Sequence, residues 1–425
     1  MKNNTKILGM LIKKNRLEQN MSQEGLCQGI CAVSYLSKIE KGTIICSEEI
    51  LRQLLDVLGI SLPTDIDLTI YENKINDFFH YYFFDNKDKV KDIMNELKEK
   101  SSVLAHSNLA IDMMLVEAYW SYLFGSNDKE NINNIIRQLL PFKHYMNEIQ
   151  TYRLYIIMGQ LEGFINHDYH SSLNYFTKAK NNTPEGFALA GVVAAHYGLG
   201  NYLDSIVLGE EAYIKLTQEG NIEFAIYVCN IIAASYANYR DVEKMAKYFK
   251  RAISLIKSDV NSARLGHVYY NLGSGYLVTA NYSEAIKYFN LSYEILNQLI
   301  NSDTRFYIYL LQKLFLANFA IGKKQQAGYY LKLSEQCYKD FPEQINIALK
   351  ASLKWLQKMY TIENYLYNKE YLNAIKDLYE VSINDTHRGY TLLYADYLVD
   401  TYKKQRKYKE ALKVTEYLHV KSQFS

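Results

Sequence analysis

Polar side chains gather on one face of a short segment near the amino terminus. Ser34, Tyr35, Ser37, Lys38 and Lys41 carry hydroxyl, phenol and amine groups, which can bond to base edges or to phosphates. The apolar positions among them recur in steps of three and predict a helix over 32–41 with one buried face. These apolar positions are Ile30, Val33, Leu36 and Ile39. A short helix with an outward polar face fits the major groove of DNA.

A preceding helix and two glycines are expected to position this segment. Ser22 is suited to cap the preceding helix, because its hydroxyl can accept a backbone N–H. Leu26 and Cys27 give that helix a small apolar side. Gly29 allows a sharp turn, and Gly42 ends the second helix as a C-terminal cap would. The stretch 22–42 is therefore predicted to form a helix, a turn, a second helix and a stop.

The expected DNA contacts follow from side-chain type. Ala32, Ser34, Tyr35 and Ser37 are expected to touch base edges. Gln23, Lys38 and Lys41 are expected to reach phosphates or flanking bases. The full predicted set of DNA-binding residues is Ser22, Gln23, Ala32, Ser34, Tyr35, Ser37, Lys38 and Lys41.

Residues from about 5 to 60 resemble the helix-turn-helix domain of the phage-repressor and xenobiotic-response-element class. The resemblance rests on 22–24, Gly29, 34–40, Gly42 and an amphipathic helix over 48–59. That class often has Glu or Gln where this chain has Gly25, which would complete a capping box with Ser22. The first helix of the motif is therefore expected to be slightly weaker. The alternative is a four-helix bundle with no role in DNA binding.

Charge predicts that DNA binding depends on well-placed contacts. The 425-residue chain has 48 Lys and Arg against 46 Asp and Glu, a formal charge of +2, and residues 1–60 carry eight basic against six acidic side chains. Useful affinity then requires two copies of the domain, so we predict a homodimer, with its dimer surface in the repeats around 371–408. We see no signal peptide and no apolar run long enough to cross a membrane, and expect a cytoplasmic protein.

The sequence offers no catalytic site, metal site or cofactor site. The cysteines are odd in number and lack Cys-x-x-Cys spacing, and no His lies in the first 79 residues to complete a zinc set with them. They are expected to be small buried residues, with metal or redox sensing as the alternative. They are Cys27, Cys31, Cys46, Cys229 and Cys337. The nine His are scattered, and no Ser-His-Asp arrangement, phosphate loop or His-Glu-x-x-His is present. We therefore predict that the protein is not an enzyme.

Beyond residue 70 a helix pair repeats along the chain. The best copy covers 269–289, and weaker copies centre on 200–206, 369–375 and 406–412, with degenerate ones at 167–169, 241–243 and 322–327. Spacings from Tyr169 to Tyr202, Val242 and Tyr282 are 33, 40 and 40 residues. This resembles the tetratricopeptide repeat (TPR), in which a small residue lets two helices approach closely. Here the small residues are Gly273 and Ala285, and Tyr276 and Tyr282 are expected to fill the remaining gap.

Stacked pairs of this kind form a right-handed superhelix with a concave face, which suits an extended peptide. An Asn carboxamide has a donor and an acceptor, so it can match a peptide N–H and C=O. Asn230, Asn238 and Asn271 fall on the first helices of consecutive units, although an Asn in this Asn-rich chain can equally be a plain surface residue. The predicted peptide-binding residues are Tyr227, Asn230, Asn238, Arg264, His267, Tyr270, Asn271 and Ser274.

The combination of a helix-turn-helix with a TPR array resembles the RRNPP family of peptide-pheromone receptor regulators, over nearly the whole chain. The resemblance implies a cytoplasmic homodimer that binds promoter DNA and a short signalling peptide, with no cofactor. We expect an all-α fold with a DNA-binding domain at 1–62, a hinge at 63–69 and a TPR-like domain at 70–425. Alternatives are a scaffold controlled by a protein partner, a protein acting on phosphotransfer, and a phage lysis–lysogeny receptor of the same architecture.

Overall fold

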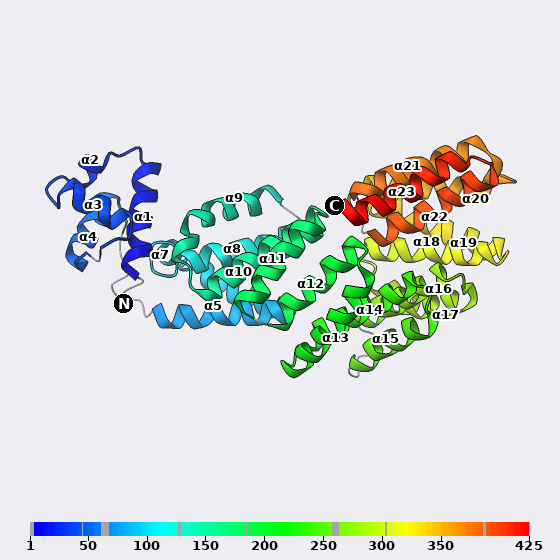
Figure 1. Cartoon of the computed structure of the whole chain (residues 1–425), viewed down its shortest axis with the longest axis horizontal. Coiled ribbons are helices and arrows are strands. Elements are labelled where there is room, and N and C mark those ends of the chain that lie inside the picture. Colours follow the sequence, from blue (N-terminus) through cyan, green and yellow to red (C-terminus); the bar gives the residue numbers. More distant parts are fainter. Residues whose placement is uncertain are drawn as a thin grey trace. The chain divides into compact units, whose positions relative to one another are not determined.

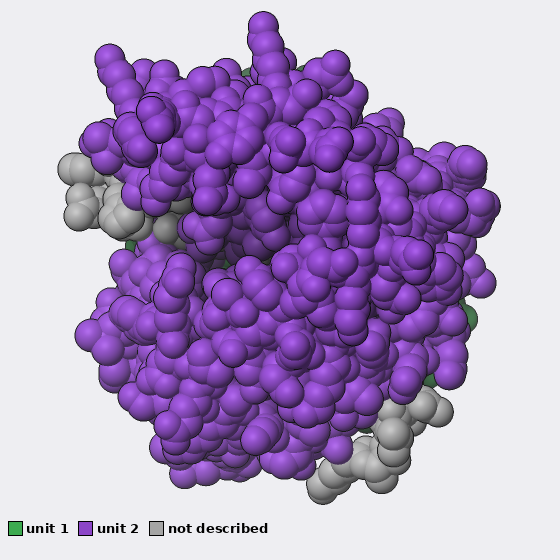
Figure 2. Space-filling model, turned by 90° about the vertical axis from the view of Figure 1, so that its right-hand side faces the viewer, with its two compact units in different colours: residues 1–166, 174–188 green, residues 167–173, 189–425 purple. Residues whose placement is uncertain are grey.

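The computed structural model describes residues 4–44, 46–60, 68–125, 129–183, 185–256, 263–301, 304–385 and 388–424. Every regular element in those ranges is a helix (Figure 1), which confirms the all-α fold class. The chain divides into two compact units, residues 1–166 with 174–188 and residues 167–173 with 189–425 (Figure 2). The predicted hinge at 63–69 lies outside the described residues except for 68 and 69, which begin a helix.

The amino-terminal part of the first unit contains the predicted helix-turn-helix. Its buried core includes Ile12, Leu26, Leu36 and Leu54, which come one from each of four helices. The helices are α1 (Asn4–Glu18), α2 (Gln23–Cys27), α3 (Val33–Glu40) and α4 (Glu48–Val57).

Two left-handed glycines set the ends of the motif. Gly29 has φ +76° in the turn between α2 and α3, and Gly42 has φ +62° just after α3. The Gly42 N–H donates to the Ile39 carbonyl at 2.8 Å, and the Thr43 N–H donates to the Lys38 carbonyl at 3.0 Å. This pair of bonds is the Schellman arrangement, which satisfies the last carbonyls of a helix. The predicted turn and stop are both confirmed.

One predicted core position of this motif is wrong. Val33 is 42% exposed, and Ile30 is half-buried, whereas Leu36 and Ile39 are buried as predicted. Val33 is the first residue of α3, and the buried face of this helix begins one turn later, at Leu36. A Cβ on Gly9 of α1 would collide with the Ile39 carbonyl, which shows how closely α1 crosses α3.

The rest of the first unit is built around aromatic rings. Tyr119 meets Phe79 and Tyr82 edge to face, with centroids 5.0 and 4.6 Å apart. The Arg153 guanidinium lies 3.8 Å from the centre of the Phe79 ring and pairs with Asp112 at 3.3 Å. The elements here are α5 (Leu68–Phe83), α6 (Lys87–Lys98), α7 (Ser101–Leu104), α8 (Ala110–Phe124), α9 (Lys129–Leu139), η1 (Leu140–Tyr145), α10 (Glu148–Gln160), η2 (Leu161–Ile165) and, from residue 174 on, α11 (Tyr169–Asn182).

The second unit is a series of antiparallel helix pairs, as the repeats predict. The second helices begin at the predicted anchors, because α13 starts at Tyr202, α15 at Val242 and α17 at Tyr282. The α-helices are α12 (Gly186–Leu199), α13 (Tyr202–Gln218), α14 (Ile222–Asn238), α15 (Val242–Leu255), α16 (Ala263–Val278), α17 (Tyr282–Leu296), α18 (Thr304–Ala320), α19 (Lys324–Asp340), α20 (Ile347–Thr361), α21 (Lys369–Asp385), α22 (Arg388–Lys404) and α23 (Tyr408–Phe424). Short 3₁₀ turns occupy η3 (Asn297–Leu299), η4 (Pro342–Gln344) and η5 (Tyr365–Tyr367).

Several of these pairs share one turn geometry. A residue with positive φ stands two positions before the second helix, whatever its side chain: Gly200 (+83°), Arg240 (+58°), Ala280 (+61°), Gly322 (+77°) and Arg406 (+58°). Glycine adopts this conformation without strain, whereas Ala and Arg do so at a cost. The repeat is therefore kept in the backbone even where its glycine is lost.

Small residues bring the helices of a pair together, as predicted. A Cβ on Gly273 would lie 2.6 Å from Phe289 Cδ1, and Ala285 is fully buried. The predicted gap-filling ring is wrong, because Phe289 fills the space beside Gly273. Tyr276 instead stacks on Tyr288, with centroids 5.6 Å apart.

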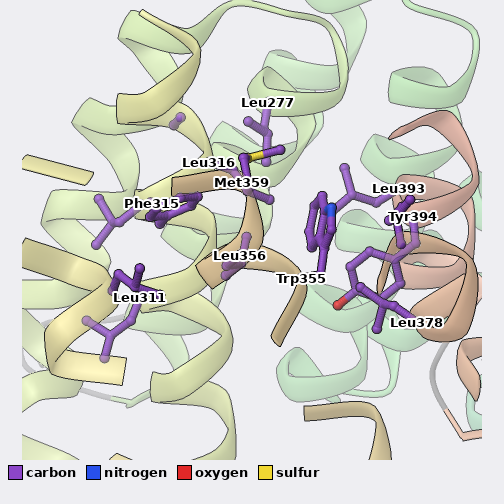
Figure 3. Close-up of a cluster of buried hydrophobic side chains, with 14 of the residues drawn as sticks. Leu277, Leu311, Phe315, Leu316, Trp355, Leu356, Met359, Leu378, Leu393 and Tyr394 are labelled. Carbon is purple, nitrogen blue, oxygen red and sulfur yellow. The ribbon is translucent and has the colours of Figure 1, made fainter. Parts of the chain in front are cut away.

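The carboxy-terminal pairs share a large core. Trp355 of α20 is almost fully buried and meets Tyr394 of α22 edge to face at 5.9 Å. Figure 3 shows the ring of Trp355 beside Leu393 and Tyr394, with Leu356 and Met359 on its own helix. This core joins the first helices α18, α20 and α22, and α18 and α22 also contribute side chains to the candidate site below.

Candidate functional site

Helix α3 presents most of the side chains that the sequence assigned to DNA. Ala32, Ser34, Lys38 and Lys41 are exposed, whereas Tyr35 and Ser37 are half-buried. On the opposite side Leu36, Ile39 and Glu40 are buried. The helix therefore has a polar outer face with two cations, Lys38 and Lys41, towards its carboxy-terminal end.

A buried ion pair fixes α3 to α1. Arg16 donates to both Glu40 oxygens, from Nε at 2.6 Å and from Nη2 at 3.0 Å, and its Nη1 donates to the Met21 carbonyl at 2.8 Å. Hydrogen bonding to Glu40 is the main cause that raises the pKa of Arg16. The sequence reasoning missed this pair. The only trace of it in the sequence is a basic residue on one predicted helix and an acidic residue on another, which does not show that the two side chains meet.

The two predicted contacts from α2 already have intramolecular roles. Gln23 Nε2 donates to Glu40 at 2.7 Å, so its amide links α2 to α3. Ser22 Oγ accepts the Gly25 N–H at 2.9 Å, which confirms the predicted cap, and Ser22 stays exposed. Both residues lie close to the amino-terminal end of α2. Their contacts with DNA remain predictions.

A second candidate surface lies in the second unit, on the helices α14 and α16. On α14 the predicted Tyr227, Asn230 and Asn238 are all half-buried. Asn230 Nδ2 donates to the Ile226 carbonyl at 3.0 Å, while its buried Oδ1 has no hydrogen-bond partner among the described residues. Asn238 Nδ2 donates to the Ala234 carbonyl at 2.8 Å. One amide proton of each side chain is therefore used within the helix, and Asn230 keeps an unused acceptor.

The remaining predicted residues lie on the neighbouring helix α16. Arg264 pairs with Glu223 at the start of α14, and this contact aligns the two helices. His267 lies against the Phe306 ring at 4.1 Å, and Asn271 is half-buried. Tyr270 is only 3% exposed, so its ring is part of the core rather than of an open surface. The sequence thus grouped these residues on α14 and α16, and the Arg264–Glu223 pair holds the two helices together.

The sequence reasoning missed a lysine beside this surface. Lys313 of α18 donates to Ser274 Oγ at 2.8 Å, and its Nζ lies 4.7 Å from the Tyr270 ring and 5.0 Å from the Tyr390 ring. Burial lowers the pKa of Lys313 to about 7. Lys313 follows Phe306 and Tyr309 at helical spacing, so extending the repeat into 304–320 would have placed all three on one face.

Among the described residues, the structure shows neither a cluster of metal-ligating side chains nor a disulfide. No group of three or more His, Cys, Asp or Glu side chains among them is placed to hold a metal ion. All five cysteines are free, and four are buried as expected, whereas Cys31 is half-buried. Burial raises the pKa of Cys337 to about 11 and that of Cys229 to about 12, so these thiols stay protonated at neutral pH. Within the described ranges, no helix has the length and apolar character needed to span a bilayer.

The fold is that of a helix-turn-helix domain joined to a TPR-like array. Residues 12–64 match the helix-turn-helix family. Over 403 residues the chain is 21% identical to the transcriptional activator NprA of Geobacillus stearothermophilus, and the match covers 93% of each chain.

Solved structures share the fold of most of the chain. A Rap protein complexed with competence and sporulation factor has a TM-score of 0.64 at 14% identity, covering 83% of this chain and 97% of the other. The quorum sensor NprR from B. thuringiensis, in its apo form, has a TM-score of 0.61 at 16% identity, covering 84% and 99%. NprR in complex with its cognate peptide NprX has a TM-score of 0.55 at 16% identity, covering 82% and 97%. These comparisons confirm the resemblance to the RRNPP regulators.

Proposed function

We propose that this chain is a quorum-sensing transcription regulator, which binds promoter DNA through α3 and is controlled by a short signalling peptide bound along α14 and α16. The observation that carries the peptide half is Asn230, whose side-chain oxygen is buried without a partner among the described residues. A buried acceptor of this kind costs free energy unless a ligand satisfies it. The observation that carries the DNA half is the exposed polar face of α3.

A peptide suits the chemistry of α14 and α16. Asn230 Oδ1 can accept a peptide N–H, and Asn271 on the next first helix has both a donor and an acceptor to offer. Tyr227 and His267 add half-buried rings that can pack against peptide side chains. The peptide complex of NprR, which has the same fold, supports this assignment.

We further propose that the protein acts in the cytoplasm as a homodimer. A domain with little net charge makes few phosphate contacts, so two half-sites about 34 Å apart, or a multiple of this, would supply the affinity. On α23, Tyr408 and Leu412 lie one turn apart and are 64% and 57% exposed, which favours the predicted dimer surface at the carboxy-terminal repeats. Sedimentation at micromolar concentration tests this proposal, and a monomer both with and without DNA would refute it.

The test of peptide control is calorimetric titration. The probes are synthetic peptides corresponding to short reading frames beside the gene. We expect one of them to bind the wild type and to bind an Asn230→Ala, Asn271→Ala double variant about 5- to 150-fold more weakly, because each of the two lost hydrogen bonds is worth about 0.5–1.5 kcal/mol. Asn281→Ala is the matched control, since Asn281 is exposed in the turn before α17.

The outcomes separate this proposal from its alternative. Equal binding to the wild type and to the double variant would show that Asn230 and Asn271 are not the site. Binding of no peptide would favour the scaffold alternative, in which a protein partner controls the array.

A further inference from the structure

Lys313 occupies an aromatic enclosure formed by three helices of the second unit. Its Nζ contacts the ring faces of Tyr270 on α16 and Tyr390 on α22 at 4.7 and 5.0 Å. The two tyrosine hydroxyls are hydrogen-bonded to each other at 2.5 Å, and Tyr309 stacks on Tyr390 with centroids 4.4 Å apart. The side chain is therefore held in place by first helices that are up to 120 residues apart in the chain.

The charge of this lysine is not balanced by an anion. An ammonium group has three N–H donors, and one of them goes to Ser274 Oγ at 2.8 Å. Among the described residues, no carboxylate pairs with Lys313, and burial is the sole cause of its lowered pKa. A desolvated cation without a counter-ion is unfavourable, and groups of this kind are concentrated at ligand-binding and catalytic sites.

We propose that Lys313 anchors a carboxylate of the bound peptide. The ammonium group of Lys313 is the group that lies against the rings of Tyr270 and Tyr390. This inference rests on the proposed peptide-receptor function and names the chemistry of the ligand. The enclosure lies next to the predicted peptide face, because Tyr270 and Ser274 stand on α16 with Asn271 between them. An incoming carboxylate would accept hydrogen bonds from the N–H groups that Ser274 leaves free, and it would neutralise this half-buried charge.

Two parts of a peptide carry this group, namely the C-terminal carboxylate and an Asp or Glu side chain. Both present two oxygens to a cation, so the enclosure alone does not distinguish them. Four pools of short random peptides distinguish them. Two pools have a free C-terminal carboxylate and two have a C-terminal amide, and within each pair one pool contains Asp and Glu and the other lacks them. Each pool is passed over immobilised full-length protein, and the retained peptides are identified by mass spectrometry.

We expect the wild type to retain peptides only from pools that carry a carboxylate. Lys313→Met keeps much of the side-chain volume without the charge. This variant should retain at least tenfold less peptide than the wild type. Lys287→Met is the control, because Lys287 is exposed on α17 and already pairs with Glu284 at 3.2 Å. Retention from the free-acid pool lacking Asp and Glu identifies the C-terminus as the source. Retention from the amide pool containing them identifies a side chain.

The affinity is also expected to depend on pH. The titratable groups around Lys313 are Tyr270 on α16, Tyr309 on its own helix and Tyr390 and Tyr394 on α22. Burial raises the pKa of Tyr270, Tyr390 and Tyr394 well above the ordinary value, so these three stay neutral over the range tested. Since the free protein must take up a proton on Lys313 to bind an anion, a pKa of about 7 weakens binding by about an order of magnitude from about pH 7 to about pH 8.5. Lys313→Arg, which stays charged, should remove this dependence.

The free protein gives a second readout. The folded state holds the lysine with a lowered pKa, so the unfolded state binds more protons from about pH 7 to the ordinary lysine value, and stability rises with pH across that window. Lys313→Met should therefore melt at a higher temperature than the wild type near pH 6, and this advantage should shrink towards pH 10. A structural lysine would instead give a variant that is less stable at every pH.

The outcomes keep this inference separate from the proposed function. Equal retention of the amide pool lacking Asp and Glu, or unchanged retention by Lys313→Met, would overturn the carboxylate anchor and leave peptide binding intact. Retention of nothing from any pool would overturn both.

Discussion

Replacing Glu40 with Gln tests how the recognition helix is held. Glu40 accepts three hydrogen bonds from two partners, Arg16 at 2.6 and 3.0 Å and Gln23 at 2.7 Å. The substitution keeps the shape but removes the charge, and it turns one acceptor oxygen into an amide that faces donors. Arg16, whose side chain is 8% exposed, is then left as a buried cation without its counter-ion.

The expected cost is large for a domain of this size. Breaking a buried ion pair on one side costs about 3–5 kcal/mol. A domain of about 60 residues has a total stability of about 3–9 kcal/mol, so Glu40→Gln should leave a substantial fraction of the domain unfolded. The helices of the second unit should keep their protection, because Glu40 belongs to the first unit.

Hydrogen exchange of the full-length protein measures this directly. We expect the α3 amides in Glu40→Gln to lose about two to three orders of magnitude of protection, which corresponds to about 3–4 kcal/mol. A double variant, Arg16→Met with Glu40→Leu, removes both charges and should recover most of the protection. Unchanged α3 protection in the single variant, or a double variant as unstable as the single one, would refute this reasoning.

Three further substitutions have defined outcomes. Gly273→Ala places a Cβ 2.6 Å from Phe289 Cδ1, and overpacking of this kind should lower the free energy of unfolding by about 1–3 kcal/mol in thermal or urea melts. Ala280→Gly relieves an exposed residue at φ +61° and should raise the free energy of unfolding by about 0.5–1 kcal/mol; a lower melting temperature would contradict this. Tyr35→Ala should relax base preference at a cost of about 1–3 kcal/mol, whereas Lys38→Ala should weaken binding to all sequences alike. Gel shifts on DNA upstream of the gene distinguish the two, and unchanged binding by both would remove α3 from the DNA interface.

Local signals in the sequence predicted much of the fold. Turn glycines such as Gly29 and Gly42 could be recognised because the required backbone conformation depends on the residue itself. The starts of α13, α15 and α17 at Tyr202, Val242 and Tyr282 followed from the repeat spacing, which records short-range packing within each pair.

Contacts between distant segments could not be predicted in the same way. Lys313, Tyr270 and Tyr390 meet only because first helices from separate repeats converge, and no spacing in the sequence encodes that convergence. The same limit applies to Arg16 and Glu40, and to the burial of Tyr270, whose hydroxyl bonds to a residue 120 positions away.

Under the proposed function, a peptide bound in the second unit changes how tightly the first unit binds DNA. The most direct measurement is the affinity of the full-length protein for its promoter DNA with and without a saturating amount of the retained peptide. We predict a change of about 5- to 150-fold, in either direction, and DNA should change the affinity for the peptide by the same factor. Identical DNA affinity with and without bound peptide would contradict the account.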